Sequence, residues 1–381
     1  MTPDIAVIGG GLSGAALAAR MAGQGRRVVL IEREAGPHDK VCGEFLSREA
    51  LLHLAALGVD ARALGGVPIG RVRLSAGRGT AEATLPFDGV GLSRRLLDEA
   101  LLRRAAEAGA TLLRGRRVRS LEPHAAGHRI RLDGDAVMHA GDAVLATGKH
   151  DLHGWKRAPG RQNDLVGFKL HLRLRPEQRR ALDGHVELTL FGGGYAGLQP
   201  VSSDRATLCL LVRRRRLVEL GGNWLGLLRA IRAGAPLLAR RLDDAEPLHA
   251  RPLTVAAIPY GLVATVRDDV WRLGDQSVVI PSFTGDGMSI ALHSAALCAV
   301  LLRNGARPPA LQAAMRRDVV RQVRGASLLS LCAVHRPAQH LAVGTARIAP
   351  ALVVRLAAAT RIPDAALRAV HVLPVGQRAP H

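Results

Sequence analysis

Two short apolar runs near the start of the chain enclose a glycine-rich turn and a helical segment. Residues 5–8 and 28–31 are uninterrupted apolar runs, typical of strands in a parallel sheet that is covered on both faces. Between them, residues 12–22 have the small, apolar composition of a buried helix, and Gly25 ends that helix. The pattern therefore predicts a strand, a turn, a helix and a second strand.

The rest of the chain shows three kinds of pattern. The pattern predicts helices at residues 48–58 and 94–109. It predicts a small antiparallel β segment at residues 72–86 and another buried strand at residues 143–147. From about residue 160 the pattern changes to alternation, as in Leu170-His171-Leu172-Arg173-Leu174, which predicts half-buried antiparallel strands. From residue 309 onward the chain is helical and rich in arginine.

These patterns predict an α/β domain interrupted by a β-rich domain and followed by helices. The expected boundaries are 1–75, 92–158 and 266–305 for the α/β domain, 76–91 and 159–265 for the β-rich domain, and 306–381 for the C-terminal helical region.

The charge of the chain is strongly basic, with a formal net charge of +21 over 381 residues. Such a charge favours nucleic acid or an anionic membrane as a partner. Only four of the 53 basic residues are lysine, however, and aromatic residues make up 3%, too few for base-stacking platforms. We therefore expect no specific nucleic-acid partner, and at most a weak association with a membrane or an acidic partner.

The cysteines and the N-terminus indicate the compartment. Four cysteines lie far apart, with no CxxC pair, so neither a zinc site nor a disulfide scaffold is predicted. The N-terminus has no basic segment before its first apolar run, and no stretch of about 18 uncharged apolar residues occurs. We expect a cytoplasmic protein without a membrane-spanning helix.

The first motif that carries chemistry is Gly9-Gly10-Gly11-Leu12-Ser13-Gly14, a G-x-G-x-x-G pattern between a strand and a helix. In such a turn Gly9 permits the tight bend, Gly11 lets the backbone approach a pyrophosphate, and Gly14 lets the helix pack on the strand. Glu32 ends the second strand, where a carboxylate accepts hydrogen bonds from ribose hydroxyls and repels a 2′-phosphate. Arg33 either stacks on the adenine or is solvated. The motif predicts FAD or NAD binding.

A second glycine-rich segment favours a flavin. Asp275 follows a strand, and an aspartate there can accept a hydrogen bond from a ribityl hydroxyl. Gly285, Gly287 and Met288 precede a second helix, whose N-terminal dipole would stabilise negative charge on a reduced isoalloxazine. Further cofactor contacts are expected from residues between these motifs, namely Arg94, Thr147 and Gly148.

Together the two glycine-rich motifs and the residues between them resemble those of the FAD-dependent oxidoreductases of the p-hydroxybenzoate hydroxylase and geranylgeranyl reductase group. The resemblance covers about residues 1–300. It implies a Rossmann-type FAD-binding domain with an inserted mixed or antiparallel β-sheet substrate domain and C-terminal helices. It also implies that FAD is held non-covalently by Gly9, Gly11, Gly14, Glu32, Arg94 and Asp275.

Two further segments resemble parts of geranylgeranyl reductase-like proteins. Residues 40–46 are similar to the Cys-Gly segment beside the flavin, where Cys42 is either a proton donor or a shape element and Glu44 is a candidate acid or base. Residues 194–200 are similar to a degenerate Tyr-x-Trp-x-Phe-Pro segment, in which Tyr195 is kept and Gln199 stands at the phenylalanine position. The change suits a smaller or more polar ring; a simple glycine turn is the alternative.

The expected pocket lies on the sheet side of the flavin. Its predicted wall consists of Phe45, Phe168, Tyr195, Gln199, Tyr260 and Phe283, and core packing is the alternative for each aromatic residue. Cys42, Glu44 and Tyr195 are the candidate catalytic residues. Lys149 and His150, after the strand at 143–147, are expected to be solvated.

Two reactions remain open. The leading hypothesis is a monooxygenase or dehydrogenase that acts on a small ring compound, with FAD as cofactor and NAD(P)H as a candidate external reductant. The Asp-Gly pair of many aromatic hydroxylases is missing, so direct reduction by NAD(P)H is undetermined. The alternative is a geranylgeranyl reductase-like ene-reductase that acts on an isoprenoid or another lipid. A halogenase is disfavoured, because no Trp-x-Trp-x-Ile-Pro segment occurs. The oligomeric state is not predicted.

Overall fold

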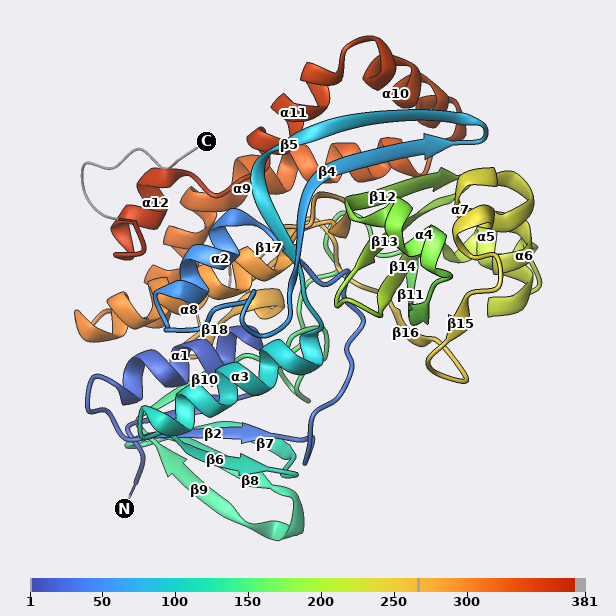
Figure 1. Ribbon diagram of the computed structural model, residues 1–381. Coiled ribbons are helices and arrows are strands. Elements are labelled where there is room, and N and C mark those ends of the chain that lie inside the picture. Colours follow the sequence, from blue (N-terminus) through green and yellow to red (C-terminus); the bar gives the residue numbers. More distant parts are fainter. Residues whose placement is uncertain (1, 266–267, 374–381) are drawn as a thin grey trace.

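The computed structural model describes residues 2–265 and 268–373 (Figure 1). The apolar runs of the sequence form a five-stranded sheet of order β18-β10-β1-β2-β6. Every neighbouring pair in it is parallel, which confirms the predicted α/β fold. Its strands are β1 (Ile5–Ile8), β2 (Val28–Glu32), β6 (Thr111–Arg114), β10 (Asp142–Leu145) and β18 (Trp271–Arg272).

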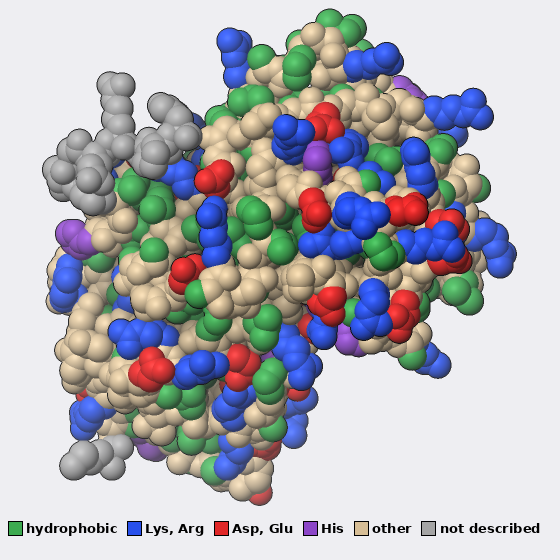
Figure 2. Space-filling view, viewed as in Figure 1, with side chains coloured by type: hydrophobic (Ala, Val, Ile, Leu, Met, Phe, Trp, Pro, Cys, Tyr) green, Lys and Arg blue, Asp and Glu red, His purple; other side chains and the backbone are tan. Residues whose placement is uncertain are grey.

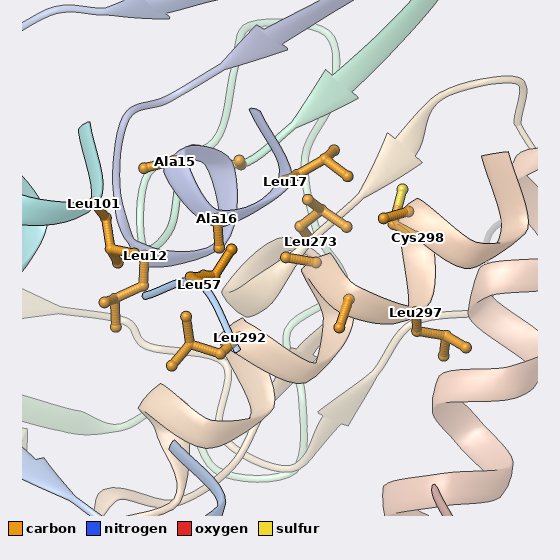
Figure 3. Close-up of a cluster of buried hydrophobic side chains, with 14 of the residues drawn as sticks. Leu12, Ala15, Ala16, Leu17, Leu57, Leu101, Leu273, Leu292, Leu297 and Cys298 are labelled. Atoms are coloured by element: carbon orange, nitrogen blue, oxygen red, sulfur yellow. The ribbon is translucent and has the colours of Figure 1, made fainter. Parts of the chain in front are cut away.

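Helices on one face of this sheet form the main core. The helix α1 (Leu12–Ala22) packs between α3 (Arg94–Glu107) and α8 (Gly287–Arg303), and α2 (Arg48–Ala55) packs on α8. Figure 3 shows apolar side chains of α1, α3 and α8 meeting there. The opposite face is covered by the small sheet of β7 (Val118–His124), β8 (Gly127–Leu132) and β9 (Val137–Ala140). Burial on both faces explains the uninterrupted apolar strands.

The second sheet is nine-stranded and mixed. It runs β15-β11-β14-β13-β12-β4-β5-β3, with β16 also paired to β11, and its one parallel pair is β12 with β4. The expected boundary after residue 75 falls inside the β4–β5 hairpin, and both strands lie in this sheet. The strands are β3 (Phe45–Leu46), β4 (Val67–Ala76), β5 (Gly79–Gly91), β11 (Leu165–Arg173), β12 (Gly184–Phe191), β13 (Gly194–Pro200), β14 (Ala206–Arg213), β15 (Glu246–Pro247) and β16 (Leu253–Ala256).

The expected antiparallel strand at 170–174 is confirmed as part of β11, but the expectation that it is half-buried is wrong. The apolar positions of β11 face a cluster that includes residues of α6 (Trp224–Gly234) and α7 (Pro236–Arg241). Its polar positions Lys169 and His171 are also buried, at 2% and 3% exposure. They are buried because they pair with a carboxylate on the opposite side of the sheet, described below. Alternation in this strand therefore separates an apolar layer from a charged layer.

The C-terminal helices cover both domains. The long α9 (Pro308–Ala333) contacts α8 and β18, and α10 (Arg336–Ile348) and α11 (Pro350–Ala359) pack on β5. The short α12 (Asp364–Ala369) follows them. Among the described residues no single helix is long and apolar enough to cross a membrane. The start of the expected segment 266–305 and the end of the region 306–381 lie outside the described residues.

Candidate active site

A cavity of about 1090 Å³ lies between the two sheets and extends beneath the C-terminal helices. One end is walled by the glycine turn after β1, the loop at 38–45 and the start of α8. The other end is walled by apolar residues of the large sheet and of α9, α10 and α11. The shape therefore combines a polar end, built from the predicted cofactor motifs, with an apolar end.

The glycine turn has the geometry that its sequence predicts. Gly9 has a φ of 110°, and a Cβ atom at Gly14 would lie 1.9 Å from the carbonyl oxygen of Gly9. Gly14 does not line the cavity, because its role is the close packing of α1 on β1. Gly11 lies at the cavity, where a Cβ atom would meet only Lys40 Nζ at 3.6 Å and Arg94 Nη2 at 3.8 Å. Two cations thus lie beside the bare backbone of the turn.

These two cations are held in place by one buried carboxylate. Asp98 accepts hydrogen bonds from Arg94 at 2.8 and 3.0 Å and pairs with Lys40 at 2.8 Å. Burial alone would raise the pKa of Asp98, but the charges of Arg94 and Lys40 lower it overall. Two cations on one carboxylate leave a net positive charge beside the turn, which suits a pyrophosphate.

Glu32 lies at the end of β2, on the cavity wall. Its carboxylate accepts hydrogen bonds from the backbone N–H of Gly10 at 2.7 Å and of Glu34 at 3.0 Å. Its side chain is buried while it lines the cavity, as a ribose-binding carboxylate must be. Arg33 also lines the cavity; it is exposed and bonds Glu34.

The second glycine segment lines the same cavity. Asp275, Gly287 and Met288 line the cavity, with the start of α8 directed at it. Gly285 has a φ of 75°, and a Cβ atom there would lie 2.8 Å from the ring of Phe45. Bare backbone is therefore needed on both sides of the polar end. The residues present fit FAD: a glycine turn with cations for the diphosphate, Glu32 for the ribose and Asp275 for the ribityl chain.

The loop at 147–151 completes this end through contacts that the sequence did not indicate. Thr147 and Gly148 line the cavity as expected. Gln276 donates a hydrogen bond to the carbonyl oxygen of Gly148 at 2.8 Å, and Arg157 donates to that of Asp275 at 2.9 Å. Lys149 donates to the carbonyl oxygen of Val41, so the expectation that it is solvated is wrong. These bonds tie the cofactor loops to one another.

Glu44 is fully buried, and both oxygens of its carboxylate have hydrogen-bonding partners. Its carboxylate accepts hydrogen bonds from Lys169 at 2.5 Å and from the backbone N–H of Arg94 at 2.8 Å, and lies 2.7 Å from His171 Nε2. Burial alone would raise its pKa, but the hydrogen bond from His171 and the charge of Lys169 lower it overall. A carboxylate that is held ionised by three partners positions the loop at 38–45. It is not free to deliver a proton.

A chain of polar groups links Glu44 to the surface. His171 Nδ1 lies 3.7 Å from Asp39, and Asp39 lies 3.2 Å from His249 Nε2. Asp39, His171 and His249 also place one ligand atom each within 4.8 Å of one another. The sequence did not indicate this group, since its members lie far apart in the chain. The signal available was Lys169 and His171, two polar residues on one face of an otherwise apolar strand.

Cys42 lies in the loop that Glu44 anchors. It lines the cavity, is partly buried, and its sulfur accepts a hydrogen bond from the backbone N–H of Glu44 at 3.4 Å. Cys209 on β14 also lines the cavity, and burial raises the pKa of its thiol to about 11. Cys332 on α9 lines the cavity as well, so Cys42 is the one of three thiols at the cavity that lies in the loop at 38–45.

The middle of the cavity holds three hydroxyl groups. Tyr195 and Tyr260 each share a hydrogen bond with Ser282, at 2.9 and 3.2 Å. Burial raises the pKa of both tyrosines, so their hydroxyls stay neutral donors. The ring of Tyr195 packs edge-on against Phe283, with the centroids 5.2 Å apart.

Gln199 lines the same cavity from β13, four residues after Tyr195. It is 3% exposed, and among the described residues no partner accepts a hydrogen bond from its Nε2. Phe45, Tyr195, Tyr260 and Phe283 line the cavity as expected. A buried amide without a partner is costly unless a ligand satisfies it.

The prediction that Phe168 lines the substrate pocket is wrong. Phe168 lies on the apolar layer of β11, where its ring is 5.6 Å from that of Trp224. Its neighbour Lys169 takes the other face of the strand, toward Glu44. No residue of β11 lines the cavity, because side chains alternate between the two faces of a strand and here one face packs on the apolar cluster while Lys169 and His171 on the other pair with Glu44.

The start of α8 is linked to the C-terminal region by an ion pair. Arg361 lies 2.7 Å from Asp286, which precedes α8, and also donates to the carbonyl oxygen of Thr284 at 2.8 Å. Burial raises the pKa of Asp286 to about 7, and the charge of Arg361 opposes that rise. The segment after α11 thereby fastens the loop that carries Gly285.

This raised pKa gives a prediction on stability. Between about pH 4 and about pH 7, Asp286 keeps its proton in the folded state but releases it in the unfolded state. The free energy of unfolding therefore falls as pH rises through that range. Relative to Asp286→Asn, the wild type should lose about 1.4 kcal/mol per pH unit there. Urea unfolding of both proteins at several pH values measures the difference; parallel curves would contradict it.

Comparison with known proteins agrees with this geometry. The model of the FAD binding domain family matches residues 2–138. The menaquinone reductase of Mycobacterium tuberculosis is 25% identical over 323 residues, which cover 78% of this chain and 76% of that protein. The digeranylgeranylglycerophospholipid reductase 2 of Methanopyrus kandleri is 27% identical over 317 residues, which cover 77% and 74%.

A solved structure shows the same fold. PqsL, a probable FAD-dependent monooxygenase from Pseudomonas aeruginosa, superposes with a TM-score of 0.69 at 19% identity and covers 89% of this chain and 99% of its own. The fold, the cofactor cradle and these similarities define an FAD-dependent oxidoreductase. More particularly, the chain is similar to the p-hydroxybenzoate hydroxylase and geranylgeranyl reductase-like group.

Proposed function

We propose that this protein is an FAD-dependent monooxygenase that acts on a small ring compound with a polar substituent. The observation that carries the proposal is the unpartnered Gln199 amide, which lines the same cavity as the hydroxyls of Tyr195, Ser282 and Tyr260. These groups stand in a cavity whose other walls are largely apolar. A few convergent polar groups in an apolar pocket orient a ring by its oxygen or nitrogen atoms.

The chain's own residues supply binding, orientation and a dry pocket. FAD, when bound, supplies the redox chemistry. The net reaction would put one atom of O2 into the product and release the other as water, with both electrons from an external NAD(P)H. Phe45 and Phe283 exclude water beside the flavin end of the cavity. The neutral hydroxyls of Tyr195 and Tyr260 would hold a substrate oxygen without adding charge.

The cellular compartment of the protein is also proposed. We place the protein in the cytoplasm, which is supported by its four free cysteines.

An oxygen-dependence experiment tests the reaction. The purified holoenzyme is incubated with NAD(P)H and a panel of phenolic and heteroaromatic ring compounds, with isotopically labelled O2 or without O2. We expect labelled product that requires O2. Product that forms equally well without O2 would overturn the monooxygenase, and a purified protein that binds no FAD would overturn every flavin reaction.

A second candidate is supported by a different observation. The apolar end of the cavity runs beneath α10 and α11, farther than a small ring needs, and the curated relatives above are named as reductases of a quinone and of an isoprenoid lipid. In that case hydride and a proton would add across a double bond, with Cys42 as the thiol nearest the cofactor loop. The same experiment separates the candidates, because a reductase needs no O2.

A further inference from the structure

The C-terminal helices expose an unusual share of the apolar surface. Six of the ten large hydrophobic residues that are exposed in the described chain lie between residues 328 and 356. We define the C-terminal apolar patch as the four of them on α10 and α11. None of the residues of α11 is buried, although the helix packs on β5. The patch consists of Leu341 at 71%, Ile348 at 88%, Leu352 at 43% and Leu356 at 39% exposure.

The charged side chains carried by α10 and α11 are all arginines. No aspartate or glutamate occurs between Asp318 and Asp364. The arginines Arg336, Arg347 and Arg355 are exposed on α10 and α11 and form no ion pair with any residue that the structure describes. Figure 2 shows hydrophobic and basic side chains at the top of the molecule, where Figure 1 places these helices. Elsewhere on the visible face, acidic side chains lie among the basic ones.

The patch is also the rim of the substrate cavity. Leu341, Leu352 and Leu356 are exposed to solvent and line the cavity at the same time. The cavity therefore opens between α10 and α11. The segments Arg336–Ile348 and Pro350–Ala369 are long and apolar enough for a membrane span only when taken together, and they are bent against each other by 109°. Helices that are bent this sharply and pack on the protein's own β-sheet lie along a membrane surface and do not span the membrane.

We propose that α10 and α11 dock on an anionic phospholipid surface, so that the cavity opens toward the lipid and a lipid-soluble substrate enters from it. The apolar patch inserts at the level of the headgroups, and Arg336, Arg347 and Arg355 contact lipid phosphates. A second copy of this chain fits less well, because a symmetric contact would place these arginines against their own counterparts. The inference goes beyond the proposed function and holds for either reaction.

Vesicle flotation tests the docking. The holoenzyme is mixed with vesicles of phosphatidylcholine alone or of phosphatidylcholine with phosphatidylglycerol. We expect binding to the anionic vesicles that weakens when salt rises from about 0.1 M to about 0.5 M. The variant Arg347→Glu/Arg355→Glu should partition at least about tenfold less. The variant Ile348→Ser should also lose binding, since that side chain is the most exposed of the patch.

Matched changes on α6 serve as controls. Leu225 is 69% exposed and Arg229 is exposed on the same helix, so Leu225→Ser and Arg229→Glu change the same chemistry away from the patch. Both should bind vesicles like the wild type, and every variant should retain its FAD. No binding, equal binding to neutral vesicles, or equal losses in the controls would overturn the proposal. So would a dimer that Ile348→Ser dissociates. Oxygen dependence, measured without vesicles, tests the reaction separately.

Discussion

Replacing Gly14 with alanine is expected to give a protein that is nearly colourless after purification. The added Cβ atom would lie 1.9 Å from the carbonyl oxygen of Gly9 and 3.1 Å from the Cβ atom of Ala146, so no flexible group is available to move aside. The start of α1 must shift away from β1, which moves the N–H groups that face the diphosphate. An overpacking cost of about 3 kcal/mol corresponds to an affinity for FAD about a hundredfold weaker.

The ratio of visible flavin absorbance to protein absorbance measures this effect, and titration with FAD gives the Kd. Gly36→Ala is the matched control, because a Cβ atom at Gly36 meets nothing within 4 Å and its φ is not left-handed. It should purify with the wild-type amount of flavin. A yellow Gly14→Ala protein with normal affinity would show that the turn does not hold the diphosphate.

The cofactor end could be predicted because its chemistry is local in sequence. Gly9, Gly11 and Gly14 need only one strand and one helix to define their geometry, and Glu32 ends the next strand. A parallel sheet brings these turns to one edge whatever the rest of the chain does. Lys40 was not singled out as a cofactor contact, because its position beside Gly11 depends on a loop that Asp98 fastens.

The substrate end depends on packing between distant segments, which periodicity does not report. Alternation in β11 predicts two faces but not what packs on each of them, so it assigns Phe168 to the pocket and misses the pairing of Lys169 with Glu44. The sequence offers Glu44 as a candidate acid or base, because its partners Lys169 and His171 lie 125 and 127 residues away in the chain and cannot be identified from it. The basic helical tail gave no sign that α10 and α11 wall the cavity.

Lys169→Met is the second change with a large expected effect, because it leaves the Glu44 carboxylate buried without its ammonium partner. The two side chains are 1% and 0% exposed. Removing one member of a buried ion pair costs about 3–5 kcal/mol, whereas replacing both members is often close to neutral. Glu44→Gln/Lys169→Met should therefore recover most of the loss, and Lys156→Met, at an exposed lysine, should be silent.

The pH dependence of this loss identifies its cause. In the wild type the pKa of Glu44 is lowered, so its contribution to stability is present above the ordinary pKa of a glutamate and is lost as pH falls through the folded value. In Lys169→Met burial dominates and the pKa of Glu44 rises, so the variant loses further stability as pH rises. Urea unfolding with saturating FAD should show the gap from wild type widening between about pH 5 and about pH 8. A gap of constant size, or a double variant no more stable than Lys169→Met, would show that lost packing and not an uncompensated charge causes the effect.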